Sequence, residues 1–232
     1  MRIAGLQKLT LLDYPGLVAC TVFTNGCNLR CPFCHNASLV LTERADASLD
    51  EQEVLAFLET RRGKLDGVAV TGGEPLLHLG LPDFLRRVRA MGYRIKLDTN
   101  GTFPDRLRAV VEEGLVDRVA MDVKNAPLLY GKTVGLRRFD LAPVEASKDY
   151  LLEGRVPYEF RTTVVRGLHT AESLVAAAHW IAPAREYYLQ QYKASDDVLA
   201  PDALGAFPDA EMQDLLARVR EVIPTAALRG VG

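Results

Sequence analysis

Three cysteines lie close together in one short segment of this chain, and their spacing suggests metal chemistry. Cys27, Cys31 and Cys34 fall in the run TNGCNLRCPFCHN, with three residues between the first two and two residues between the last two. Thiolates bind soft metals, and iron–sulfur clusters are usually held by four of them. Three thiolates from one loop can hold three corners of a [4Fe–4S] cluster and leave the fourth iron open, as a catalytic zinc site leaves one position open. The segment therefore predicts a metal centre with these three cysteines as ligands.

Two other uses of these thiols remain open from the residues alone. His35 follows Cys34 directly and could complete a structural Cys₃His zinc site, although adjacent residues rarely point at one metal together. Cys20 could instead supply a fourth thiolate to a closed electron-transfer cluster. Cys20 lies in the apolar run VACTVFT, however, where a free cysteine behaves as a small hydrophobe. We therefore expect Cys20 to be a core residue.

Length and composition indicate one domain over residues 1–232, since 48% of the residues are hydrophobic. The chain has 28 basic and 30 acidic residues and a net charge of −2, so nucleic acid is not an expected partner. It shows no signal-peptide pattern and no run near the roughly 20 apolar residues that cross a bilayer. We expect a cytoplasmic protein with no membrane partner, in which thiols stay reduced and bind metal.

Six short runs rich in β-branched, aromatic and other apolar residues predict strands. They cover residues 18–24, 67–71, 94–99, 118–123, 159–165 and 186–192. Helical patterns follow at 48–63, 81–92, 104–114, 171–181 and 210–223, and the first begins with Ser48 and Glu51 at capping-box spacing. Such alternation indicates parallel βα units. The predicted fold is α/β, a partial, open (β/α)6 TIM-like barrel of parallel strands, whose lateral mouth could admit a macromolecular substrate.

The informative polar residues fall where these predicted strands end. The cysteine loop follows the first strand, and the second and third strands end in TGGEP and DTNG. Asp122 and Lys124 close the fourth strand, Arg161 lies on the fifth, and Gln190 and Tyr192 are at the end of the sixth. The carboxyl ends of parallel strands share one face of a barrel, which is where such folds place their chemistry. We therefore expect one site on that face, although TGGEP could be a simple turn and Asp122 with Lys124 a structural ion pair.

The run CNLRCPFC resembles the CxxxCx(aromatic)C signature of radical S-adenosylmethionine (SAM) enzymes, with Phe33 at the aromatic position. The GGEP segment after the next predicted strand strengthens this resemblance. The whole chain, from LQKLTLLDYPG onward, is similar to the activating proteins that install glycyl radicals. Among these it looks most like the activators of anaerobic ribonucleoside-triphosphate reductase, and TLLDYPG together with TVFTNGCNLRCPFCHN carries that closer likeness.

The resemblance implies a [4Fe–4S] cluster held by Cys27, Cys31 and Cys34, with SAM bound at the open iron. It assigns the backbone of the GGE motif to the SAM amino group, because glycines let a main chain approach a ligand. It also implies a monovalent cation near the SAM carboxylate, held by oxygen ligands. The residues expected around SAM and this cation are Phe33, Gly72, Gly73, Glu74, Asp98, Thr99, Asp122, Lys124, Arg161, Gln190 and Tyr192.

Two departures separate this chain from other activators. Pyruvate formate-lyase activators carry a histidine at the end of the sixth strand, where this chain has Tyr192 with Gln190 just before it. No cysteine lies between Cys34 and Gly72, so the ferredoxin-like insert of larger activators is missing. The resemblance therefore leaves adenine recognition open.

The function implied is a radical SAM activase, an oxidoreductase that takes an electron from flavodoxin or ferredoxin and cleaves SAM reductively. It would then generate a glycyl radical on a partner enzyme, expected to be anaerobic ribonucleoside-triphosphate reductase. Hydrogen-atom abstraction needs no protein base, so no catalytic acid or base is expected. Three alternatives remain: an activator of pyruvate formate-lyase or another glycyl-radical enzyme, a radical SAM enzyme with a small-molecule substrate, and a non-enzymatic zinc or electron-transfer module.

Overall fold

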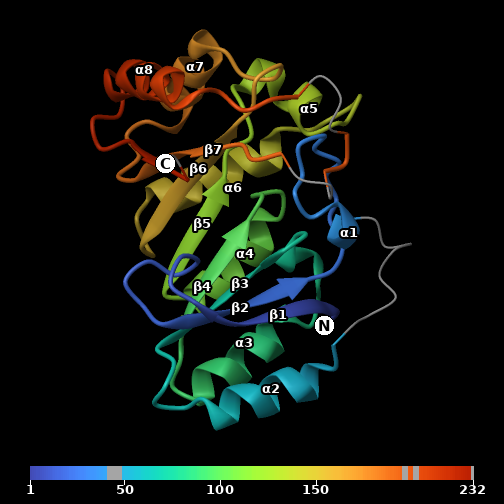
Figure 1. The fold of residues 1–232 in the computed structure, drawn as a ribbon. Coiled ribbons are helices and arrows are strands. Elements are labelled where there is room, and N and C mark those ends of the chain that lie inside the picture. Colours follow the sequence, from blue (N-terminus) through green and yellow to red (C-terminus); the bar gives the residue numbers. More distant parts are fainter. Residues whose placement is uncertain (41–48, 195–197, 201–203, 231–232) are drawn as a thin grey trace.

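The computed structural model describes residues 1–40, 49–194, 198–200 and 204–230, and it contains one eight-stranded sheet (Figure 1). Its strands lie in chain order, every neighbouring pair from β2 to β8 is parallel, and β1 is antiparallel to β2. The sheet ends at β1 and β8, so it is open. The strands are β1 (Ile3–Thr10), β2 (Ala19–Thr24), β3 (Gly67–Gly72), β4 (Arg94–Thr99), β5 (Arg118–Asp122), β6 (Tyr158–Val164), β7 (Tyr187–Gln191) and β8 (Ala227–Arg229).

Helices connect the successive strands from β2 to β8 and give six βα units (Figure 1). This arrangement confirms the predicted open (β/α)6 barrel of parallel strands. No helix in the described part of the chain has the length and apolar character that a bilayer crossing requires. The helices are α1 (Ala37–Val40), α2 (Glu51–Thr60), α3 (Leu81–Ala90), α4 (Pro104–Glu112), α5 (Tyr130–Thr133), α6 (Ala142–Leu152), α7 (Ala171–Ile181) and α8 (Asp209–Arg220), with short 3₁₀ turns η2 (Pro75–Leu77) and η3 (Pro127–Leu129).

The six predicted strands correspond to β2 to β7, each within two residues of its expected bounds. The prediction missed the two outer strands β1 and β8, because neither is a buried apolar run: β1 is largely half-buried or exposed, and β8 has only three half-buried residues. The predicted start of the first helix was wrong. Helix α2 begins at Glu51, and Asp50 caps it by accepting the Gln52 N–H at 2.9 Å. Ser48 lies outside the described residues.

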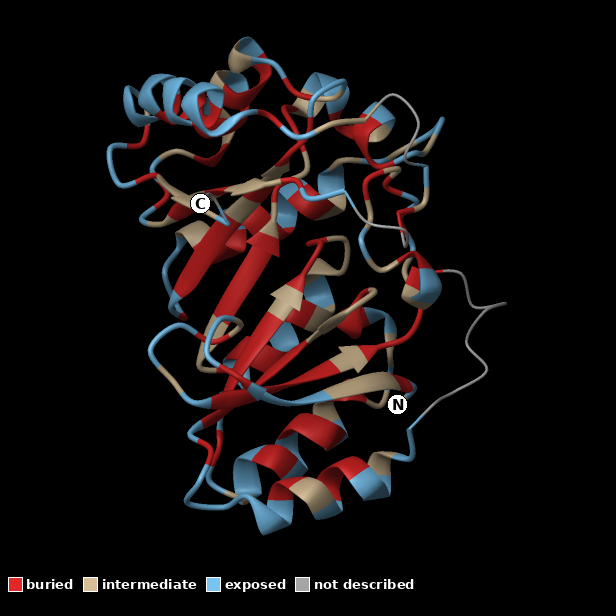
Figure 2. Cartoon of the chain, in the orientation of Figure 1, coloured by how far each residue is buried: buried red, intermediate tan, exposed pale blue. Residues whose placement is uncertain are grey.

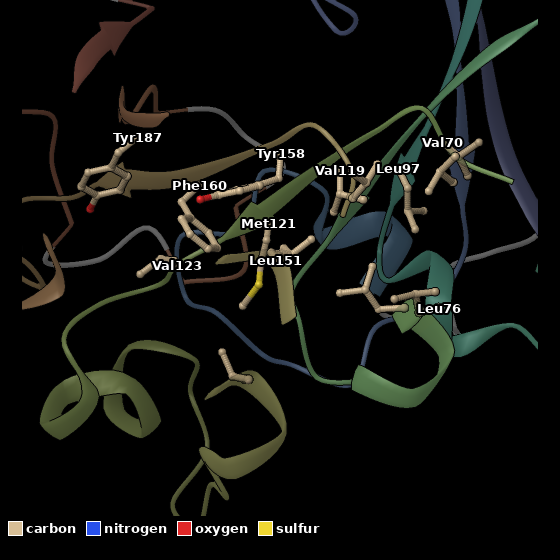
Figure 3. Close-up of a cluster of buried hydrophobic side chains, with 14 of the residues drawn as sticks. Val70, Leu76, Leu97, Val119, Met121, Val123, Leu151, Tyr158, Phe160 and Tyr187 are labelled. Atoms are coloured by element: carbon tan, nitrogen blue, oxygen red, sulfur yellow. The ribbon is translucent and has the colours of Figure 1, made fainter. Parts of the chain in front are cut away.

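The convex face of the sheet packs against the helices and forms the apolar core (Figure 2). Figure 3 shows part of it, with Val70, Leu97 and Met121 from neighbouring strands facing Leu76 and Leu151. Figure 2 also shows that the inner strands are largely buried, whereas the outer faces of the helices are exposed. Successive residues of a strand point to opposite faces, so the large apolar side chains of alternate positions, such as Val70, Leu97 and Met121, share this face.

Cys20 belongs to this apolar core, as the sequence predicted. Its side chain is fully buried on β2, and burial raises the pKa of its thiol to about 12. A thiol in such surroundings stays protonated and behaves as a small hydrophobe. Cys20 is therefore separated in role from the three cysteines of the loop that follows β2.

The concave face carries charged side chains instead, and its base is built around Glu159. The fully buried Glu159 carboxylate accepts hydrogen bonds from Arg118 Nη2 at 2.7 Å and from Arg229 Nη1 and Nη2 at 2.6 and 2.9 Å. Burial alone would raise the pKa of Glu159, but the two arginines outweigh it and lower the pKa to about 2. Arg229 is on β8 and also lies over the Tyr188 ring at 3.4 Å, so these contacts hold the last strand to the sheet.

Replacing Glu159 with alanine should lower the free energy of unfolding by about 3 kcal/mol, because two partly buried arginines lose their shared carboxylate. Urea denaturation of the purified protein measures this difference. The matched control is Glu186→Ala, since Glu186 also pairs with Arg118 but is more than a third exposed, and such pairs contribute about 1 kcal/mol or less. Equal losses in both variants would contradict a central role for Glu159.

Candidate functional site

A cavity of about 240 Å³ opens at the carboxyl ends of the parallel strands, next to the cysteine loop. The structure therefore brings most of the predicted site residues to one place. Twelve of the fourteen line this cavity: Cys27, Cys31, Cys34, Phe33, Gly72, Gly73, Asp98, Thr99, Asp122, Lys124, Arg161 and Gln190. The other two, Glu74 and Tyr192, lie behind its wall.

The three loop cysteines face this cavity from segments that are held by backbone hydrogen bonds. The Gly26 N–H donates to Leu39 O at 2.7 Å, and the Arg30 N–H donates to Val134 O at 3.0 Å. Burial raises the pKa of the Cys31 thiol to about 12 and also raises that of Cys27. Without a metal these thiols are protonated, so a metal that binds them must displace protons. Three convergent sulfur donors fit a soft metal centre such as an iron–sulfur cluster.

The zinc alternative required His35 and the three thiols to converge on one ion. Instead, the His35 ring packs against the Tyr192 ring, with 5.2 Å between the ring centroids. Among the described residues, no group of three or more His, Cys, Asp and Glu side chains is placed to hold a single ion. The packing of His35 on Tyr192 thus gives the Cys₃His alternative no support.

The two glycines of the GGE motif are required by close packing of backbone on backbone. A Cβ atom on Gly73 would lie 2.0 Å from Gly26 O, and one on Gly72 would lie 2.3 Å from Thr24 N. Gly72 also has φ +122°, a conformation that L side chains rarely adopt. The Gly73 and Glu74 N–H groups already donate to Thr24 O and Gly26 O, at 3.0 and 2.8 Å. An ammonium group needs hydrogen-bond acceptors, so the backbone carbonyl oxygens of this motif are the atoms that could bind it.

Glu74 is fully buried, and its side chain joins the GGE motif to the loop after β4. Its carboxylate accepts hydrogen bonds from Asn100 N at 2.7 Å, Thr99 Oγ1 at 2.9 Å and Leu76 N at 3.0 Å. Burial raises the pKa of Glu74 to about 7, although these three donors act in the opposite direction. Its placement indicates that Glu74 positions the loop rather than contacting a ligand through its side chain.

A chain of partly buried charges forms the floor of the cavity. Arg161 donates to Asp98 at 3.0 Å through Nη1, and to Asp122 at 2.9 Å through Nη2. Lys124 Nζ donates to Asp122 at 2.8 Å, and Lys96 Nζ pairs with the other oxygen of Asp98. Burial would raise the pKa of Asp122, but Lys124 and Arg161 outweigh it and lower the pKa to about 2. Asp122 and Lys124 are therefore an ion pair that also lines the cavity.

These pairings bear on the expected monovalent cation. Both oxygens of Asp98 and both oxygens of Asp122 already accept from lysine or arginine side chains. Carboxylate oxygens can accept more than one partner, so a cation could bind only in addition to these lysine and arginine charges. The expected cation stays a prediction.

Gln190 and Tyr192, at the end of β7, are placed differently. Gln190 lines the cavity, whereas Tyr192 is only 1% exposed and packs on His35. The Tyr192 hydroxyl is buried and has no hydrogen-bond partner among the described residues. Gln190 is therefore the better placed of the two to contact a ligand directly, and Tyr192 supports the ring of His35.

Sequence reasoning missed several residues of the site. Lys96 is almost fully buried in a strand that reads as apolar, and its role depends on the pairing with Asp98. Asn100 belongs to the DTNG segment, which could have drawn attention to it, but its orientation is set by residues distant in sequence. The further cavity-lining residues are Leu29, His35, Asn36, Val40, Thr71, Asn100 and Thr163.

Comparisons with known proteins agree with this arrangement. Residues 21–180 match the family model described as the radical SAM superfamily. A Methanocaldococcus jannaschii protein provisionally named a glycyl-radical enzyme activating enzyme is 28% identical over 202 residues, which cover 84% of this chain and 81% of that protein. The 7-carboxy-7-deazaguanine synthase of Methanopyrus kandleri is 29% identical over 170 residues, 62% of this chain and 66% of that enzyme.

Among solved structures, SuiB of Streptococcus suis bound to the precursor peptide SuiA superimposes with a TM-score of 0.72. The superposition covers 90% of this chain and 48% of that one, at 13% sequence identity. At this identity the likeness concerns the fold alone. It agrees with the open barrel described above.

The raised pKa of Glu74 predicts a pH-dependent stability. Because the folded pKa of about 7 lies above the ordinary value of 4.5, the stabilisation that protonated Glu74 provides is complete below pH 4.5 and is lost as pH rises through 7. The loss should reach up to about 3 kcal/mol at pH 8. In Glu74→Gln this ionisation is absent, so the wild type should lose stability relative to the variant between pH 4.5 and 8. Urea denaturation of the metal-free proteins at both pH values measures this change.

The control for this comparison is Glu112→Gln, which alters an exposed glutamate at the end of α4. Its stability difference from the wild type should change much less between the two pH values. A constant difference between the wild type and Glu74→Gln would show that Glu74 does not titrate as described.

Proposed function

This chain belongs to the radical SAM superfamily, and on that premise we propose that it is an activating enzyme that generates a glycyl radical on a partner enzyme. As a member of this superfamily it is an oxidoreductase that uses a [4Fe–4S] cluster and SAM. We infer anaerobic ribonucleoside-triphosphate reductase as the partner and flavodoxin or ferredoxin as the reductant. The similarity to the Methanocaldococcus protein, which extends over most of both chains, supports this class of activity.

The residues of the cavity fit the two cofactors. Cys27, Cys31 and Cys34 would hold three irons, and no fourth cysteine lines the cavity in the described part of the chain. When bound, the cluster and SAM supply a carbon-centred radical through reductive cleavage of SAM, and this radical can take a hydrogen atom from a glycine Cα. The protein supplies binding and orientation for this chemistry.

Charged groups on the cavity floor suit a ligand with both a carboxylate and an ammonium group. Lys124 donates one hydrogen bond to Asp122 and has two further N–H donors, so it can also bind a carboxylate. Its ammonium group lies 5.9 Å from the centre of the Phe33 ring, which fixes its position next to the cysteine loop. The carbonyl oxygen of Gly73, and that of Gly72 beside its contact with Asn36 Nδ2 at 3.5 Å, can accept from an ammonium group. These residues are therefore the proposed contacts of the methionine part of SAM.

The observation that supports a protein substrate is the apolar surface carried by the segments around the cavity. Leu79, after β3, is 81% exposed, and Leu128, after β5, is 99% exposed. Both residues lie in connections that leave the carboxyl ends of strands, as the cavity-lining Gly73 and Lys124 do. Contiguous exposed apolar surface marks sites that bind another protein, and we propose that these two leucines form part of such a surface.

A second candidate is a radical SAM enzyme acting on a small molecule, which the similarity to a 7-carboxy-7-deazaguanine synthase favours. In that case the partner surface would be unnecessary, and a heterocyclic substrate would have to fit beside SAM. An activator of pyruvate formate-lyase remains an alternative within the first class. These candidates differ in the molecule that loses a hydrogen atom to the radical: a protein glycine or a small-molecule substrate.

The protein reconstituted with iron and sulfide under argon, then mixed with SAM, dithionite and anaerobic ribonucleoside-triphosphate reductase, should produce a glycyl radical on the reductase. Electron paramagnetic resonance should show the doublet of a glycine Cα radical. Cys31→Ala should reduce both SAM cleavage and the doublet to background, because one iron loses its only protein ligand. If only pyruvate formate-lyase gave the doublet, it would replace the reductase as the proposed partner. If no glycyl-radical enzyme gave the doublet, the activase proposal would be refuted.

Cys20→Ala is the matched control for Cys31→Ala. It removes a thiol of the core rather than of the cavity, so iron content and SAM cleavage should stay at the wild-type level. Loss of the cluster absorbance in Cys20→Ala would restore the four-thiolate electron-transfer alternative.

Replacing Leu128 with aspartate tests the partner surface. The variant should lower the yield of glycyl radical on the partner at least tenfold at limiting partner concentration, because a charge replaces an apolar contact. SAM cleavage driven by dithionite without the partner should be unchanged. Ala109→Asp, at an exposed position of α4 outside the cavity lining, adds the same single negative charge and is the control. Equal radical yields from the wild type and Leu128→Asp would exclude this surface.

A further inference from the structure

Asn100 lies against a cysteine of the metal loop, although it is distant from that loop in sequence. It follows β4 directly, is 5% exposed and lines the cavity. Its side-chain nitrogen Nδ2 is 3.7 Å from Cys27 Sγ, within hydrogen-bond distance for a sulfur acceptor. The same nitrogen donates to Asn28 Oδ1 at 3.0 Å. Its two N–H groups thus have one sulfur partner and one oxygen partner.

The orientation of this amide is fixed by Thr102. Asn100 Oδ1 accepts from Thr102 N at 3.0 Å and from Thr102 Oγ1 at 2.6 Å. A backbone N–H can only donate, so the atom facing it must be the amide oxygen and not the nitrogen. Thr102 Oγ1 also accepts from Asn28 Nδ2 at 2.8 Å, which closes the network. The amide nitrogen is therefore directed at Cys27.

The backbone of Asn100 is anchored as firmly as its side chain. Its N–H donates to the buried Glu74 carboxylate at 2.7 Å, and Glu74 also accepts from Thr99 Oγ1 at 2.9 Å. Gly101, with φ +78°, turns the chain immediately afterwards. The donor is thus held in place before any cofactor binds.

Cys27 receives a second N–H donor from its own loop, since Leu29 N lies 3.4 Å from Cys27 Sγ. Hydrogen bonds to ligand sulfur withdraw electron density from an iron–sulfur cluster and stabilise its reduced, more negative form. Asn28 bonds to both Asn100 and Thr102, so the three side chains form one network beside Cys27.

We propose that Asn100 is a positioning residue that raises the reduction potential of the cluster by donating an N–H···S hydrogen bond to Cys27. It eases entry of the electron from the reductant, and it links the GGE motif to the cluster through Glu74. This role rests on the assignment of Cys27 as a cluster ligand and is independent of the identity of the partner enzyme.

The test is the midpoint potential of the reconstituted holoprotein, measured by redox titration without SAM and followed by electron paramagnetic resonance of the reduced cluster. Asn100→Leu removes the donor without adding charge, and Asn100→Asp keeps the acceptor for Thr102 but replaces the donor with an acceptor. Both should shift the midpoint to more negative values. A tenfold fall in the ratio of reduced to oxidised cluster at fixed potential corresponds to about 59 mV for one electron. We expect a shift of that order in Asn100→Leu and a larger one in Asn100→Asp.

Thr102→Ser is the matched control, because it keeps the hydroxyl that orients Asn100 and leaves the contact between Asn100 and Cys27. Its midpoint should equal that of the wild type. Thr102→Val, which removes the hydroxyl that orients Asn100, should give a smaller shift in the same direction, and it carries the test if Asn100→Leu does not take up iron.

Three results would overturn the proposal. An unchanged midpoint in Asn100→Leu with full iron content would exclude the hydrogen bond as a determinant of potential. A shift in Asn100→Asp alone would assign the effect to charge. Failure of the wild type to form any cluster would refute the ligand assignment itself, and this is distinguishable because iron analysis detects it before the titration begins.

Discussion

The contact between the backbone of the GGE motif and the start of the cysteine loop is the constraint on which the site depends. Gly73 N–H and Glu74 N–H donate to Thr24 O and Gly26 O, and a Cβ on Gly73 would overlap Gly26 O. This contact continues the parallel pairing of β2 with β3 beyond the last strand residues. It fixes where the loop leaves the sheet, and hence where Cys27 lies. A side chain at position 73 would force the two segments apart and separate the metal ligands from the cavity floor.

The buried carboxylate of Glu74 connects this contact to the neighbouring strand β4. Glu74 accepts from the segment after β4, which contains Thr99 and Asn100, and Asn100 returns to Cys27. Three successive strand ends are thereby joined in a closed ring of hydrogen bonds. Each buried donor in this ring has a partner, as buried polar groups require. The side chain of Glu74 therefore acts on the site through the residues that it holds, while its backbone forms the site wall.

The sequence was sufficient to predict β2 to β7 and the face on which the chemistry lies, because those strands are short apolar runs that end in polar residues. The outer strands were missed because their stability comes from pairing: β1 lies along β2, and β8 is held by Arg229, which binds Glu159. Lys96 and Asn100 were missed for the same reason. Lys96 belongs to the site because it pairs with Asp98. Asn100 belongs to it because Thr102 orients its side-chain amide. Such partners come from the tertiary structure, and local pattern does not specify them.

The charged concave face raises the question of why this barrel is not filled with apolar side chains. Replacing buried ion pairs by well-packed hydrophobic residues is often neutral or stabilising, so these charges are not explained by stability alone. Positive and negative side chains alternate from the base of the concave face to the cavity. Arg118 and Arg229 bind Glu159, and the charge of Lys96 lowers the pKa of Glu159. Lys96 also pairs with Asp98, which accepts from Arg161. Each charge in the series restrains the next. Arg161 and Lys124 are therefore held in position before a ligand enters, and this preorganisation is what a site for a zwitterionic ligand requires.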